Sequence, residues 1–224
     1  PGVIDGIIGR KTIAAIKAFQ ASNGLQVDGI IGKQTMAALG ILPRQNFSDE
    51  DNKNETIPAY LPWMLEARRL IGLKEYAGSG SNPVLMEMAQ DLDLDNTFKN
   101  DEVPWCGLFV AHCIASQLPD ESLPQNPLRA RNWKKFGQPA QPSLGAIMVF
   151  WRGSTSSGLG HVGFYAGENN THYFILGGNQ GNQVCVAKVS KERFLGARWP
   201  STAQHYIIKR TFENGLVETV ENEA

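Results

Sequence analysis

The chain has few cysteines, and their number and spacing exclude a disulfide-stabilised fold. Its 224 residues contain Cys106, Cys113 and Cys185, whereas a disulfide framework needs a larger, even set. On one helix, Cys106 and Cys113 would stand about 10 Å apart, which exceeds the Cα separation that a bridge tolerates. A disulfide between Cys113 and Cys185 is the one alternative left by the spacing, but buried free thiols are the favoured interpretation.

The chain also lacks a net excess of positive or negative charge and lacks long hydrophobic runs. The formal net charge is −1, whereas proteins that bind nucleic acid usually carry a basic excess. No hydrophobic run approaches the roughly 18 residues of a membrane-spanning helix. The His-Glu-x-x-His and Gly-x-Ser-x-Gly motifs of zinc peptidases and serine hydrolases are absent. We expect a monomer without metal or other cofactor, and neither nucleic acid nor a membrane as partner.

An internal repeat occupies the first 40 residues. Residues 4–12, IDGIIGRKT, return as residues 27–35, VDGIIGKQT. Each copy begins with an Asp-Gly turn signal and continues into a segment with apolar residues at helical spacing. Asn23-Gly24 follows the first such segment and is typical of a helix end. The repeat predicts a unit of turn, helix, turn and helix.

These residues resemble the peptidoglycan-binding domain found on many wall hydrolases. The family pattern is Val-Asp-Gly-x-x-Gly-x-x-Thr-x-x-Ala followed by a hydrophobic residue, with Phe-Gln between copies, where this chain has Phe19-Gln20. The resemblance implies peptidoglycan as the partner, and we place binding residues at Asp5 and Asp28. We assign the module to residues 1–42 and expect it to be truncated at its N-terminus, because the family usually begins with a further helix. A helical hairpin used only for packing is the alternative.

The remainder divides into a linker and a larger domain. Residues 43–58 are polar, acidic and without periodicity, which indicates a solvated linker. Residues 59–224 read as helices first and strands second, a pattern typical of an α+β domain with an antiparallel sheet. The expected helices are 61–71, 83–92, 106–117 and 127–136; the expected strands are 145–151, 161–167, 171–176, 184–189 and a hairpin of 206–211 with 216–220.

One cysteine stands where it can be chemically active. In residues 103–111, VPWCGLFVA, a proline precedes the expected helix, so Cys106 falls at the helix start. Unpaired N–H groups and the positive end of the helix dipole stabilise a thiolate there. His161 opens an expected strand within Gly-His-Val-Gly, and Asn179 ends the next strand within Gly-Gly-Asn-Gln. A thiol, a base and a residue that orients the base are the parts of a nucleophilic triad.

This arrangement resembles the papain-like CHAP and NlpC-type cysteine peptidases and amidases of the cell wall. The resemblance rests on Pro-Trp-Cys-x-x-Phe-Val, Gly-His-Val-Gly and Gly-Gly-Asn-Gln, and covers roughly residues 60–212. It implies Cys106 as nucleophile, His161 as base and Asn179 as the orienting residue, with Gln180 behind Asn179. We also place Trp105 and Gln180 among the substrate-binding residues.

The resulting hypothesis is a peptidoglycan hydrolase that cleaves an amide bond of the stem peptide, as an amidase or an endopeptidase. Its place of action would be the bacterial cell wall or periplasm. A phage endolysin is favoured, since the first residues show no signal peptide. A secreted bacterial wall-remodelling or antibacterial enzyme of the same chemistry, and a non-catalytic wall-binding protein, are the alternatives.

Overall fold

The computed structural model describes residues 10–27, 29, 35, 38, 61–76 and 80–211. Asp5, Asp28, the predicted linker and the predicted strand 216–220 lie outside these residues. The described helices are α1 (Arg10–Ser22), α3 (Pro62–Arg69), α4 (Pro83–Asp91), α5 (Cys106–Gln117) and two short 3-10 helices, η1 (Ala130–Lys135) and η2 (Lys191–Arg193). The strands are β1 (Gln138–Ala140), β2 (Ile147–Trp151), β3 (Gly160–Glu168), β4 (His172–Gly177), β5 (Cys185–Ser190) and β6 (Phe194–Trp199).

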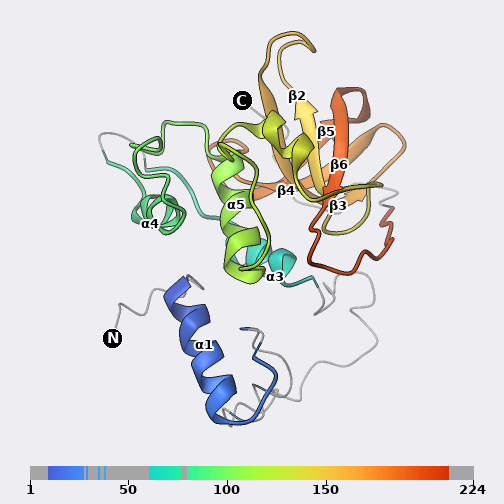
Figure 1. The fold of residues 1–224 in the computed structure, drawn as a ribbon. Coiled ribbons are helices and arrows are strands. Elements are labelled where there is room, and N and C mark those ends of the chain that lie inside the picture. Colours follow the sequence, from blue (N-terminus) through green and yellow to red (C-terminus); the bar gives the residue numbers. More distant parts are fainter. Residues whose placement is uncertain are drawn as a thin grey trace.

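The strands form one six-stranded sheet in the order β1-β6-β2-β3-β4-β5, and every pairing in it is antiparallel. Helix α5 lies against the sheet, with α3 beside it (Figure 1). The predicted α+β class with an antiparallel sheet is therefore confirmed. Helices precede strands along the chain, as the sequence pattern indicated.

Three of the four predicted helices in this part of the chain are present at nearly the predicted bounds. Proline stands in the first turn of both α3 and α4, where its missing N–H does no harm. Asn82 caps α4 by accepting a hydrogen bond from the N–H of Val84. The predicted α-helix at 127–136 is wrong, because only the 3-10 turn η1 forms there.

The last part of the sheet differs from the prediction. Strand β6 lies between β1 and β2 and was not predicted from the sequence. Leu195, Ala197 and Trp199 alternate with Gly196 and Arg198, but the alternation is short and contains glycine, which is depleted in strands. The predicted strand at 206–211 forms no ladder and makes a single bridge, between Thr211 and Glu168. Its backbone nevertheless runs along the sheet, since Leu144 donates to the carbonyl of Ile208 at 2.8 Å.

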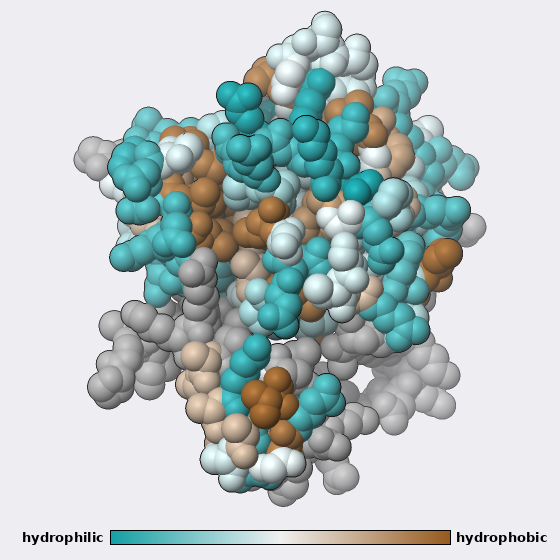
Figure 2. Space-filling view, in the orientation of Figure 1, coloured by the Kyte–Doolittle hydropathy of each residue, from teal (hydrophilic) through white to brown (hydrophobic). Residues whose placement is uncertain are grey.

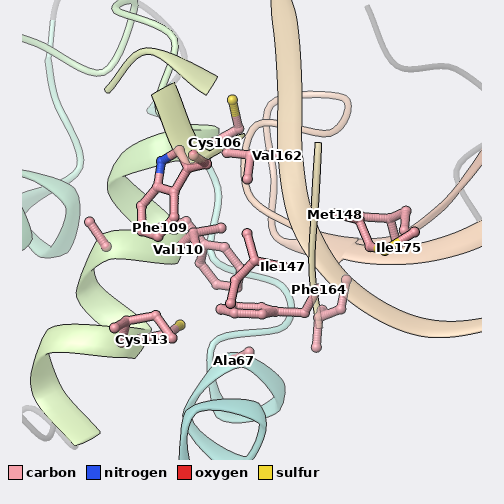
Figure 3. Close-up of a cluster of buried hydrophobic side chains, with 14 of the residues drawn as sticks. Ala67, Cys106, Phe109, Val110, Cys113, Ile147, Met148, Val162, Phe164 and Ile175 are labelled. Carbon is pink, nitrogen blue, oxygen red and sulfur yellow. The ribbon is translucent and has the colours of Figure 1, made fainter. Parts of the chain in front are cut away.

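Helix α5 is buried along almost its whole length. Residues 106–114 are all buried, and Phe109 meets Phe164 of β3 edge to face at a centroid distance of 6.0 Å. Figure 3 shows this core, with Cys106 at one end of the helix and Cys113 further along it. All three cysteines are buried free thiols, as predicted. The packing fixes α5 against β3 and so sets the position of its first residue.

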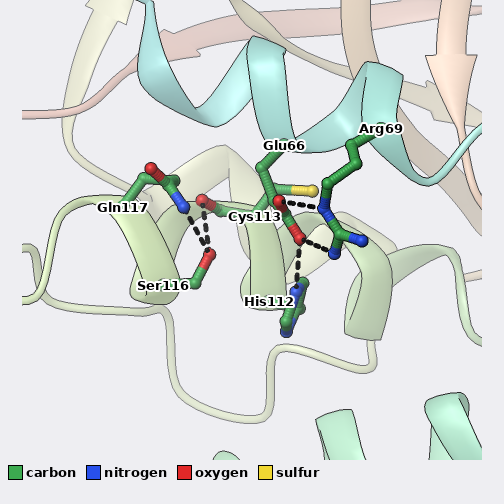
Figure 4. Close-up of polar contacts among 6 residues, drawn as sticks. All are labelled: Glu66, Arg69, His112, Cys113, Ser116 and Gln117. Carbon is green, nitrogen blue, oxygen red and sulfur yellow. Dashed lines mark hydrogen bonds and ion pairs between the residues drawn. The ribbon is translucent and has the colours of Figure 1, made fainter. Parts of the chain in front are cut away.

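A buried polar cluster joins α3 to α5 (Figure 4). Glu66 is 2% exposed; its Oε1 lies 3.0 Å from His112 Nε2 and 2.7 Å from Arg69 Nη2, and its Oε2 accepts from Arg69 Nε at 2.8 Å. Burial, with the negative charge of Glu66, raises the pKa of the Cys113 thiol well above its usual value. The cluster gives His112 a structural role, since its contact with Glu66 links α5 to α3.

On the face shown in Figure 2 hydrophilic residues predominate; hydrophobic residues gather between α4 and α5, and others lie on α1 and singly elsewhere. Among the described helices, none is long and apolar enough to cross a membrane.

Candidate active site

Cys106 is the first residue of α5, and Trp105 is the residue before the helix. The first intrahelical bond runs from the N–H of Phe109 to the carbonyl of Trp105, so the preceding N–H groups have no intrahelical acceptor. A Cβ added at Gly107 would lie 2.1 Å from the carbonyl oxygen of Pro127. Only glycine allows the helix start to approach the 127–128 backbone this closely, which explains the residue that follows the cysteine.

His161 brings a base to this thiol. It is the second residue of β3, pairs with Phe150 of β2 and is 1% exposed. Although burial raises the pKa of the Cys106 thiol, the hydrogen bond and positive charge of His161 lower it, helped by the N–H groups of Val162 and Gly107. The net pKa lies below the ordinary value of 9.0. This is the electrostatic environment of a reactive rather than a structural cysteine.

Gln180 occupies the other side of the imidazole. Its Oε1 lies 3.0 Å from His161 Nε2, and the residue is completely buried. Its Nε2 donates to three backbone carbonyl oxygens at 2.6, 3.1 and 3.2 Å, those of Cys185, Ile175 and Gly177. Side chain and backbone therefore hold this amide in one orientation.

That orientation determines the tautomer of His161. Carbonyl oxygens only accept hydrogen bonds, so the NH2 end of Gln180 must face them and Oε1 must face the imidazole. His161 Nε2 consequently carries a proton and donates a hydrogen bond to Gln180 Oε1. Nδ1 is then the ring nitrogen that exchanges a proton with Cys106.

The loop between β4 and β5 is shaped to deliver Gln180. Asn179, Gly181 and Asn182 have φ of 55°, 59° and 59°, a left-handed conformation that asparagine and glycine adopt most readily. A Cβ at Gly178 would lie 2.6 Å from the Trp105 ring, so a larger residue would push the loop off the helix start. The Gly-Gly-Asn-Gln-Gly-Asn run is thus explained by the turn that places one amide at His161.

The structure brings together Cys106, His161 and Gln180, but places Gln180 rather than the predicted Asn179 at His161. Asn179 serves the turn through its backbone conformation and is half-buried. The direction in which each side chain points in an irregular turn could not be predicted from the sequence. The motif contains two adjacent amide side chains, and either could have contacted the histidine.

Trp105 and Gln180 do not line an open substrate surface. Trp105 is completely buried, and its Nε1 donates to Glu75 Oε1 at 2.6 Å. The prediction that these two side chains contact substrate is therefore corrected: Trp105 packs beneath the loop and Gln180 holds the histidine. Glu75 was not found from the sequence, because nothing in its surroundings relates it to a tryptophan 30 residues later.

Comparison with known families concerns the other end of the chain. Residues 1–39 match the model of a family described as a peptidoglycan binding domain. The N-terminal module is a peptidoglycan-binding domain. This agrees with the resemblance seen in the repeat, and supports peptidoglycan as a partner and association with the cell wall. No curated protein and no solved structure matches the chain.

Within the peptidoglycan-binding domain, Gln20 connects the two copies of the repeat. It is 1% exposed; its Oε1 accepts from the N–H of Gly29 at 2.7 Å and its Nε2 donates to Thr35 Oγ1 at 3.1 Å. Helix α1 ends as predicted, with Gly24 at φ 66° and the N–H of Leu25 bonded to the Gln20 carbonyl. The glutamine, glycine and threonine of the motif thus stabilise the module itself.

Proposed function

We propose that the protein is a peptidoglycan hydrolase that cleaves an amide bond of the stem peptide through a thioester on Cys106. The observation that carries the proposal is the buried, hydrogen-bonded sequence Cys106–His161–Gln180. The peptidoglycan-binding domain supports the choice of substrate, since tethering to a polymer raises the local concentration of its cleavable bonds. A thiol at a helix start, followed in the chain by a histidine on a strand and an amide in the loop after the next strand, is similar to the arrangement in the CHAP and NlpC-type enzymes with a papain-like fold.

The triad supplies both proton transfers of the reaction. His161 Nδ1 takes the proton of Cys106, and the thiolate sulfur attacks the carbonyl carbon of the scissile amide. As the C–N bond breaks, His161 returns the proton to the leaving amine, which leaves an acyl group on sulfur. Water then attacks this thioester, its proton passes to His161, and the carboxylic acid and free thiol are released.

The start of α5 also offers a hydrogen-bond donor that can stabilise the negative charge on the tetrahedral intermediate. The backbone N–H of Cys106 lies in the first turn of α5, where no intrahelical acceptor exists. A donor aimed at the developing oxyanion is typically worth about 10²–10³-fold in rate. Gln180 acts at a distance from the reacting atoms, as a residue that positions the base.

The proposal predicts the products that the purified protein releases from isolated sacculi. Mass spectrometry of the soluble fraction should show free stem peptides with intact glycan for an amidase, or crosslinked dimers converted to monomers for an endopeptidase. A Cys106→Ser variant provides the matched control and should release neither. Disaccharides with new reducing ends, or unchanged release by the variant, would overturn the proposal.

A Gln180→Ala variant should leave the thiol present but less acidic. His161 loses the acceptor that orients it, so its stabilising effect on the thiolate weakens and the pKa of Cys106 rises. We expect kcat/KM to fall by about 10²-fold, as for a misplaced catalytic group. The rate of alkylation by iodoacetamide should reach its half-maximum at higher pH than in the wild type, a shift that a purely structural role would not produce.

Asn179→Gly is the control for that experiment, because glycine retains the left-handed conformation of the turn. It should leave both kcat/KM and the pH of half-maximal alkylation close to the wild-type values. If Asn179→Gly moves the alkylation profile while Gln180→Ala does not, the orienting residue is Asn179 after all.

A further inference from the structure

A pocket of about 260 Å³ is lined by two chain segments that pair with each other through their backbones. Its walls are residues 74–76, which follow α3, and residues 181–183, which follow Gln180. The backbone fixes both walls: the N–H of Glu75 donates to the carbonyl of Asn182 at 3.0 Å, and Lys74 forms an antiparallel bridge with Gln183. The mechanism above uses none of the side chains that line this pocket.

Each wall is linked to a different member of the triad through a residue that neighbours it in the chain. Glu75 accepts the indole N–H of Trp105, the neighbour of Cys106. Gly181 is the neighbour of Gln180, which holds His161. The Trp105 side chain and its backbone link to Cys106 thus account for the separation between the Glu75 wall and the nucleophile. Because an extended peptide advances about 3.3–3.6 Å per residue, a few residues of a bound peptide span that separation.

The pocket carries one charge of each sign. Glu75 is partly buried and uses Oε1 for Trp105, while Lys74 is exposed. Within the part of the chain that the structure describes, neither side-chain charge has an ion-pair partner. An anion and a cation on the walls of one small pocket complement a ligand group that itself carries both charges.

We infer that this pocket binds a residue of the peptide substrate that carries both a free amine and a free carboxylate, such as a C-terminal residue with an amino group in its side chain, with Glu75 receiving the ammonium group and Lys74 the carboxylate. The inference rests on the proposed hydrolase function and assigns a specificity site to it. The anchoring of Glu75 to Trp105 orients its carboxylate in advance, so the side chain loses little freedom on binding. A group held here lies at a fixed distance from Cys106 and so selects which amide bond reaches the thiolate.

The test uses the full chain and a soluble wall fragment that the wild type cleaves. The fragment is prepared in three forms: unmodified, acetylated at its free amine, and amidated at its terminal carboxylate. Glu75→Gln keeps an acceptor for Trp105 and removes the charge, and Lys74→Gln removes the other charge. With the unmodified fragment, each variant should raise KM about tenfold, the usual effect of a lost hydrogen bond to a charged group, with kcat nearly unchanged.

The modified fragments show which charge meets which residue. Acetylation of the amine should raise the KM of the wild type by the same factor, but should not raise the KM of Glu75→Gln any further. Amidation of the carboxylate should raise the KM of the wild type and leave that of Lys74→Gln unchanged, as expected when the two modified groups contact each other. Asp120→Asn and Lys99→Gln remove exposed charges elsewhere and should leave KM unchanged. A wild-type protein that cleaves the fragment, together with variants of unchanged KM, would overturn the pocket assignment alone. A wild-type protein that cleaves nothing would instead overturn the proposed function.

Discussion

A Cys106→Ala variant is expected to lose amide cleavage by about 10⁴-fold or more, the effect of removing a nucleophile that acts as part of a triad. The methyl group of alanine cannot form the thioester, and His161 is left with no proton to take. The rate of release of soluble fragments from sacculi, compared at equal protein concentration, measures the effect. Binding to sacculi should be unchanged, since residues 1–39 form a separate match to the peptidoglycan-binding family.

Cys113→Ala is the matched control, because both cysteines are buried on the same helix and differ in chemistry. Cys113 lies beside Glu66, which with burial raises the pKa of its thiol, whereas His161 holds the pKa of Cys106 below its ordinary value. Cys113→Ala should retain cleavage near the wild-type rate. Cys106→Ala should melt close to the wild-type temperature, since alanine removes a single sulfur atom and leaves the packing of α5 against β3 in place. Equal activity of the two variants would show that the thiol of Cys106 takes no part in the reaction.

Local signals were sufficient to predict the helix that begins at Cys106 and the strand that carries His161. A proline just before an apolar run fixed the start of α5 at Cys106, and the structure begins the helix at that residue. Gly-His-Val-Gly likewise indicated a strand that carries His161 close to neighbouring backbone. Both inferences depend on residues within a few positions of each other, where steric and capping rules act directly.

The third residue could not be chosen from the sequence. Asn179 and Gln180 are adjacent amides of similar chemistry, and the choice depends on three carbonyl oxygens that Gln180 reaches across the β4–β5 turn. Those partners come from two strands, so no local pattern encodes them.

Strand β6 and Glu75 were missed for a related reason. The pairing of β6 with both β1 and β2 places a short segment that contains glycine inside the sheet, so tertiary context rather than strand propensity decides it. The Glu75–Trp105 hydrogen bond joins a loop to a helix start across 30 residues of chain. Contacts of this kind follow from the packed fold, and so does the pocket that they border.

A Glu66→Gln variant is expected to lower the free energy of unfolding by about 3 kcal/mol at neutral pH, the lower end of the effect of breaking a buried ion pair. Glu66 is 2% exposed and holds both the buried His112 and the partly exposed Arg69, so removing its charge leaves the buried imidazole without its anion. Urea unfolding measures the change. Glu168→Gln is the control: the Glu168 side chain is itself 16% exposed and contacts the partly exposed Lys191 and the exposed Lys209, and such pairs contribute about 0–1 kcal/mol.

The same carboxylate predicts how stability depends on pH. Burial raises the pKa of Glu66, but its hydrogen bonds and charge attraction to Arg69 and His112 outweigh this and hold the pKa below the ordinary value of 4.5. A pKa that is lower in the folded than in the unfolded state means that the contribution is complete above the unfolded value and is lost as pH falls through the folded one. The difference in unfolding free energy between wild type and Glu66→Gln should therefore be constant from neutral pH down to about pH 5 and shrink below about pH 4. A difference that persists undiminished in acid would mean that the side chain stabilises α3 against α5 by its shape and hydrogen bonds alone, without its charge.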